Sequence, residues 1–169
     1  MRPPTPAVRL VVLPLVLLAA LTPSQGAGQS SRVTGASVER FYLGEYHFTA
    51  VNFRRTDLTQ DGAGLDLAAG FVPTALAARV ALLDLDVGLA RALQVGPAML
   101  VLKGGVSSFA AVGGDANFLY PGVQAGLAIV IPLERRCGLR LDLGRSYYFP
   151  QDGPFQLWSI GVGLAVLRR

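Results

Sequence analysis

The chain has 169 residues, of which 51% are hydrophobic and 15% are charged, and its formal net charge at pH 7 is +4. This length favours a single domain, and the composition is more apolar than that of an ordinary soluble domain. The charge is modest and no basic stripe carries interleaved aromatic residues, so nucleic-acid binding is not expected. The single cysteine, Cys137, excludes an intrachain disulfide.

The N-terminal segment has the features of a secretory signal peptide. Arg2 and Arg9 supply positive charge, residues 10–21 form an apolar stretch that is too short for a spanning helix, and small and polar residues follow. We expect residues 1–28 to be a cleaved signal peptide and residues 29–169 to be the mature β-barrel domain. An uncleaved anchor is the alternative interpretation of the same segment.

After residue 60, apolar residues alternate with small or charged ones. Leu65, Leu67 and Phe71 fall on one face of a strand, opposite Asp66 and Gly70. Nothing after the leader reaches the roughly 18 unbroken apolar residues that a spanning helix needs. The alternation therefore predicts strands whose apolar face meets lipid in a closed sheet. The same pattern returns at residues 83–89, 123–131, 139–143 and 158–166.

Turn signals divide the mature chain into eight expected strands. Asp61-Gly62 and Asp152-Gly153 are examples of such turns, and a further turn is expected at residues 91–94. The spacing is typical of an up-and-down meander. The predicted fold class is all-β, an antiparallel up-and-down transmembrane β-barrel of eight strands. The strands are expected at residues 33–42, 47–55, 64–72, 78–90, 95–109, 118–131, 138–147 and 155–167.

A helix over residues 75–93 is the main alternative to this pattern. Alanine and leucine, which are frequent there, are good helix formers. However, apolar residues alternate from Ala81 to Leu89, with Asp84 and Asp86 together on the opposite side. A helix would place these two carboxylates about 200° apart, so the pattern favours a strand.

Aromatic residues and arginines gather at opposite rims of the predicted barrel if both termini are periplasmic. Aromatic rings favour the boundary between water and lipid, so the aromatic residues are interpreted as a girdle. The expected aromatic rim comprises Phe118, Tyr120, Tyr147, Tyr148, Phe149, Phe155 and Trp158. The expected periplasmic turns contain Arg54, Arg55, Arg91, Arg135 and Arg136.

The polar face of the strands would line the barrel interior. An eight-stranded barrel has room only for its own side chains, so we expect a packed interior without an open pore. Buried charges need partners, and Arg140 is expected to pair with Asp84 or Asp86. A proton or ion path is the alternative role for these residues. The expected interior polar network comprises Asp66, Asp84, Asp86, Gln124, Arg140 and Asp142, with Lys103 as a further candidate.

The leader, the alternating segments and the glycine-rich final strand at residues 155–167 (FQLWSIGVGLAVL) together resemble the small outer-membrane β-barrel proteins of OmpA/OmpX-like architecture. The resemblance implies location in the outer membrane of a Gram-negative-type bacterium. It also implies insertion by the barrel-assembly machinery and contact with outer-membrane lipid. Members of this group usually end in an aromatic residue, whereas this chain ends in Arg168-Arg169.

Catalytic, cofactor-binding and metal-binding motifs are not recognised in the sequence. The single histidine, His47, has Glu45 nearby in the sequence and Ser107 near the same predicted rim. A base beside a nucleophile is the minimum for acyl transfer, but no motif spacing surrounds these residues. One histidine and one cysteine cannot supply the usual structural zinc site. We therefore expect neither enzyme activity, nor a cofactor, nor a metal.

The expected function is that of an outer-membrane β-barrel protein with a structural or surface-binding role, whose ligand is unknown. The alternative is a soluble secreted or periplasmic β-barrel that binds an apolar ligand. In that alternative the apolar face would point inward and the polar face would meet water.

Overall fold

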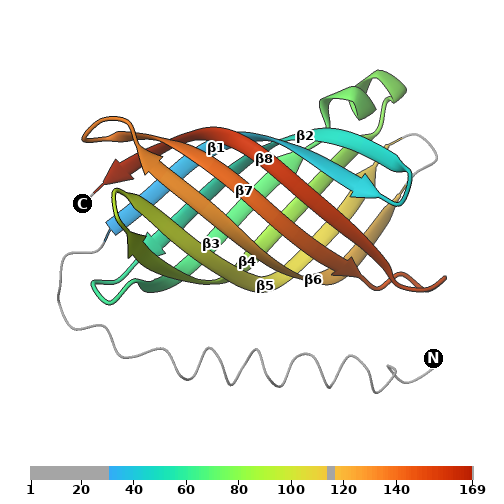
Figure 1. The fold of residues 1–169 in the computed structure, drawn as a ribbon. Helices are drawn as coiled ribbons and strands as arrows, with labels where there is room; N and C mark the ends of the chain where they lie inside the picture. The colour runs from blue at the N-terminus through green and yellow to red at the C-terminus, as the bar shows by residue number, and fades with distance from the viewer. Residues whose placement is uncertain (1–30, 114–116, 169) are drawn as a thin grey trace, which may run out of the picture.

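The computed structural model describes residues 31–113 and 117–168, which form one closed antiparallel β-barrel (Figure 1). Each strand pairs with the next one in the chain, and the last strand pairs with the first. The up-and-down barrel of eight strands expected from the sequence is confirmed. The expected signal peptide at residues 1–28 lies outside the described residues.

The eight strands match the expected segments, with ends that extend further in several cases. A short 3-10 helix, η1 (Pro73–Ala78), lies between the third and fourth strands. Among the described residues, no helix is long and apolar enough to cross a membrane. The strands are β1 (Ser31–Leu43), β2 (Tyr46–Leu58), β3 (Ala63–Phe71), β4 (Ala81–Val95), β5 (Ala98–Val112), β6 (Phe118–Pro132), β7 (Cys137–Tyr148) and β8 (Phe155–Arg168).

The predicted turn at residues 91–94 is wrong, because these residues continue β4. The chain reverses at Gly96-Pro97, and Val95 pairs with Ala98 across this two-residue connection. Gly96 has a φ of 58°, a conformation that glycine adopts readily at the first position of such a hairpin. The segment that allowed a helical alternative forms only η1 before β4 begins.

Alternate residues of each strand point to opposite sides of the wall. Leu65 and Leu67 are 55% and 43% exposed, whereas Asp66 between them is fully buried. The apolar face is therefore outside and the polar face is inside. A soluble barrel with an apolar ligand cavity requires the opposite arrangement.

The two ends of the barrel differ in their connections. One end, called the terminal end below, holds the start of β1 and the end of β8, together with the turns β2–β3, β4–β5 and β6–β7. The other, called the loop end, holds η1 and the remaining connections (Figure 1). Arg135 and Arg136 lie in the β6–β7 turn as expected. Arg55 and Arg91, by contrast, are strand residues near the terminal end.

A pair of glycines allows β4 and β5 to approach closely. Gly88 and Gly105 are partners in the β4–β5 register. A Cβ atom on Gly105 would lie 2.2 Å from the carbonyl oxygen of Val87, which is closer than real Cβ contacts come. A Cβ atom on the adjacent Gly104 would lie 3.5 Å from the carbonyl oxygen of Gln124, an ordinary contact. The two neighbouring glycines therefore have different tolerance for a side chain.

Candidate functional site

The barrel interior is divided into three zones along its length. An apolar group, called the terminal cluster, fills the terminal end. Charged and polar side chains occupy the middle. Aromatic rings gather at the loop end. The terminal cluster consists of Val33, Leu58, Ala90, Val101, Ala128, Val130 and Ala165.

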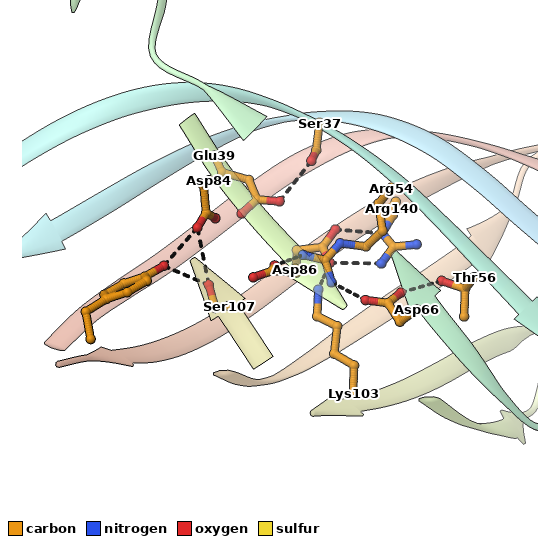
Figure 2. Close-up of polar contacts among 12 residues, drawn as sticks. Ser37, Glu39, Arg54, Thr56, Asp66, Asp84, Asp86, Lys103, Ser107 and Arg140 are labelled. Atoms are coloured by element: carbon orange, nitrogen blue, oxygen red, sulfur yellow. Dashed lines mark hydrogen bonds and ion pairs between the residues drawn. The ribbon is translucent and has the colours of Figure 1, made fainter. Parts of the chain in front are cut away.

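Arg54 organises one half of the central polar zone. Its Nη1 donates to Oδ2 of Asp66 at 2.6 Å, and its Nη2 donates to Oδ2 of Asp86 at 3.0 Å (Figure 2). Thr56 donates from Oγ1 to the other oxygen of Asp66 at 2.7 Å. All four side chains are buried. One arginine thus ties β2 to β3 and β4.

The expectation that Arg54 lies in a periplasmic turn is wrong. Strand β2 continues to Leu58, and the even-numbered positions of this strand face inward. The alternation between apolar and polar residues is weak in the first two strands. A pair of adjacent arginines, Arg54 and Arg55, therefore suggested a turn, although only Arg55 is exposed.

Asp142 organises the other half of the polar zone. It accepts two hydrogen bonds from Arg140, from Nε at 2.7 Å and from Nη2 at 3.1 Å. It also accepts one from Nζ of Lys103 at 2.5 Å. The expected pairing of Arg140 with Asp84 or Asp86 is wrong. Arg140 instead pairs with a residue two positions along the same inward face of β7.

Among the described residues, Asp84 has hydroxyl partners but no cationic partner. Tyr148 donates to its Oδ1 at 2.8 Å, and Ser107 donates to the same oxygen at 3.3 Å. A separate contact, in which Ser37 donates to Glu39 at 3.0 Å, provides a second buried acid with a hydroxyl partner (Figure 2). The described part of the chain places five buried acids and three buried cations in the interior.

All six residues of the expected polar network face the interior and are buried. Gln124 differs from the others because no described residue accepts a hydrogen bond from its buried Nε2. The sequence interpretation left out Glu39, Arg54 and Asn52, which are also buried and inward-facing. Their strands alternate too weakly for the inward face to be recognised from residue types alone.

A connected group of aromatic rings, called the aromatic closure, crosses the interior at the loop end. The ring centroids of Phe41 and Phe48 are 5.2 Å apart, and Phe48 and Phe109 are 6.0 Å apart. Tyr148 lies 5.8 Å from Phe109 and 5.2 Å from Phe155. These separations are typical of favourable aromatic pairs. The closure comprises Phe41, Phe48, Phe109, Phe118, Tyr120, Tyr148 and Phe155.

The expected aromatic rim is thus divided between the two sides of the wall. Phe118, Tyr120, Tyr148 and Phe155 belong to the aromatic closure. The remaining members are exposed, Tyr147 at 38%, Phe149 at 46% and Trp158 at 44%. These residues lie at one end of the barrel but on both sides of its wall, so a single girdle does not describe them. The alternation of neighbours such as Tyr147 and Tyr148 is the signal that would have separated them.

Residues considered for catalysis are not brought together. His47 is exposed on the outer face of β2, whereas Ser107 is buried inside the barrel against Asp84. Among the described residues, no group of three or more His, Cys, Asp or Glu side chains could hold a metal ion.

A hollow of about 120 Å³ at the terminal end is lined in part by Val33 and Val130 of the terminal cluster.

Comparison with protein-family models and with curated proteins finds no match. Among solved structures, the N-terminal β-barrel domain of OprF from Pseudomonas aeruginosa is similar, with a TM-score of 0.63 and 12% identity over 83% of this chain and 98% of that domain. Neisserial surface protein A gives a TM-score of 0.57 and 10% identity over 84% of this chain and 99% of that one.

A de novo designed transmembrane β-barrel is also similar, with a TM-score of 0.53 and 16% identity over 86% of this chain and 100% of the design. At these identities the likeness concerns the fold. The chain has the closed eight-stranded architecture of small transmembrane barrels, and the resemblance expected from its sequence is confirmed at that level.

Proposed function

We propose that this chain is an outer-membrane β-barrel protein of a Gram-negative-type bacterium, with a structural or surface-binding role and no open pore. The observation that carries the proposal is that side chains in mutual contact occupy all three zones of the interior. Apolar side chains occupy the terminal end, ion pairs the middle and aromatic rings the loop end.

The outer wall supports residence in a bilayer. Apolar side chains are exposed along every strand, including Val87 at 52% and Ile160 at 55%. Exposed apolar surface on this scale is unfavourable in water but favourable against lipid tails. Outer-membrane lipid is accordingly the proposed partner. The leader at residues 1–28 and the barrel-assembly machinery are the proposed route to the membrane.

The packed interior supports the absence of a pore. The three buried cations each lie within hydrogen-bond distance of a buried carboxylate, and such pairs resist separation. Water or ions crossing the barrel would have to displace both the terminal cluster and the aromatic closure. We propose no cofactor for this protein. Surface binding would involve the connections at the loop end.

Single-channel recording from the purified barrel in planar bilayers tests this proposal. We expect no stable conductance above the baseline, with the intact fold verified by heat-modifiable mobility on a gel. Large, stable conductance steps from folded monomer would contradict a closed interior. Recovery of the protein from the soluble periplasm without detergent would contradict membrane residence.

A further inference from the structure

We propose that the outer wall carries a binding site for the phosphate of an anionic lipid, formed by Arg40 and Arg145 on either side of Trp158. The inference rests on the proposed function, since it requires this wall to face a bilayer. The site, called the Arg–Trp patch below, comprises Arg40, Tyr42, Arg145, Tyr147, Gln156 and Trp158.

Three neighbouring strands bring these residues together. Trp158 of β8 is the register partner of Tyr42 in β1 and of Arg145 in β7. Arg40 precedes Tyr42 by two residues and so shares its outward face. Both arginines therefore flank one tryptophan on the outside of the barrel, near the loop end.

The two arginines differ from the other charged residues of the outer wall. The other charged residues that face outward from the strands lie toward the terminal end, where Arg32 and Arg55 share Asp57 and Arg91 pairs with Asp61. Within the described ranges, neither Arg40 nor Arg145 forms an ion pair. Their acidic neighbours in the strands, including Glu39, face the interior. The patch thus presents two positive charges that no described carboxylate pairs with.

Arg145 is held in a fixed orientation. Its Cζ lies 4.6 Å from the centroid of the Trp158 ring and 4.8 Å from that of Tyr147. Its Nη2 donates to the Tyr147 hydroxyl and to Oε1 of Gln156. Its Nε is buried and has no partner among the described residues. Because Nε is shielded by neighbouring atoms and Nη2 already has partners, an anion would meet the stacked guanidinium at Nη1, for which the described residues supply no hydrogen-bond partner.

A lipid phosphate matches this arrangement. A guanidinium presents several N–H donors in a rigid plane, which suits the oxygens of a phosphate group. Exposed tyrosine and tryptophan rings mark the depth at which headgroups lie. An unpaired arginine on a lipid-facing wall is unfavourable, and a headgroup phosphate at the same depth would supply the missing charge.

The single tryptophan of the chain makes the site directly observable. Wild-type protein would be refolded into phosphatidylcholine vesicles with a minor fraction of phosphatidylglycerol, and either lipid would carry bromine to quench Trp158 fluorescence. We expect phosphatidylglycerol to be enriched beside Trp158 by about fivefold for each arginine. The double variant Arg40→Gln/Arg145→Gln should reduce quenching to the bulk lipid ratio. Arg91→Gln, a matched outward arginine far from the patch, should retain the enrichment.

The possible outcomes distinguish the lipid-phosphate site from the proposed membrane residence. Quenching by both brominated lipids in the bulk ratio in the wild type would overturn the lipid site and leave membrane residence intact. Absence of quenching by either lipid would overturn membrane residence itself. Inorganic phosphate added to the outer solution should leave the enrichment unchanged, and loss of enrichment at low phosphate concentration would assign the site to free phosphate instead.

Discussion

The hydroxyl of Tyr148 donates a hydrogen bond of 2.8 Å to Oδ1 of Asp84, and this contact joins the aromatic closure to the central polar zone. The tyrosine ring stacks with Phe155, while its oxygen meets a carboxylate that pairs with no cation in residues 31–113 and 117–168. One side chain therefore belongs to both zones, and its two parts can be tested separately.

Tyr148→Phe keeps the stacked ring and removes the hydroxyl. We expect a loss of about 1–3 kcal/mol in the free energy of unfolding, because Asp84 would keep only Ser107 as a partner. Urea unfolding in vesicles, followed by Trp158 fluorescence, measures this loss. Tyr46→Phe, at a tyrosine that is 79% exposed, is the control and should stay within about 0.5 kcal/mol of the wild type. Equal effects of the two variants would argue against a specific role for the hydroxyl.

Arg54→Met should be among the most damaging substitutions in the interior. It would leave Asp66 and Asp86 buried without their cation, which typically costs about 3–5 kcal/mol. The adjacent Arg55→Met, at an exposed ion pair, should cost about 0–1 kcal/mol. Heat-modifiable mobility after incubation at increasing urea concentration compares the two. A stable Arg54 variant would mean that the carboxylates find other partners.

The close approach of β4 and β5 predicts different results for two neighbouring glycines. Gly105→Ala would place its Cβ against the backbone of β4 and force the strands apart, whereas Gly104→Ala has ordinary space. Overpacking of this kind typically costs about 1–3 kcal/mol. The yield of folded barrel and its urea midpoint should fall for Gly105→Ala alone. Similar values for both variants would show that the strands tolerate the extra atom.

If the outer wall contacts lipid, the loss of stability caused by an outward-facing arginine should depend on its depth in the bilayer. Val87 lies near the middle of β4 and Leu93 near its terminal end, and both are exposed. Val87→Arg should destabilise the barrel by about 2–4 kcal/mol in a bilayer, and Leu93→Arg by about 0–1 kcal/mol. Unfolding titrations in vesicles measure the difference. A soluble barrel would tolerate both arginines equally.

The strands and their inward faces could be predicted because one pattern repeats in most of them. A single alternating segment such as residues 63–71 is enough to assign Asp66 to the polar face, and that face points inward if the outside of the barrel meets lipid. The partners of the buried charges could not be predicted in this way. Whether Asp86 meets Arg54 or Arg140 depends on how the barrel brings side chains of different strands together across its interior, which alternation along one strand does not reveal.

For the aromatic residues, position along the strand and side of the wall must be predicted separately. Their positions along the strands group them at one end of the barrel. Their side of the wall follows from the alternation of odd and even positions, which separates Tyr147 from Tyr148 and which position along the strand alone does not show. Arg54 was misplaced because β1 and β2 alternate weakly.

The pairing of β1 with β8 has a consequence for biogenesis. Until β1 and β8 pair, the sheet has two unpaired edges, and such edges readily bind other chains. Tyr42 and Trp158 are partners across this seam, so the environment of the single tryptophan should change when the barrel closes. The fluorescence of Trp158 should therefore report barrel closure during folding.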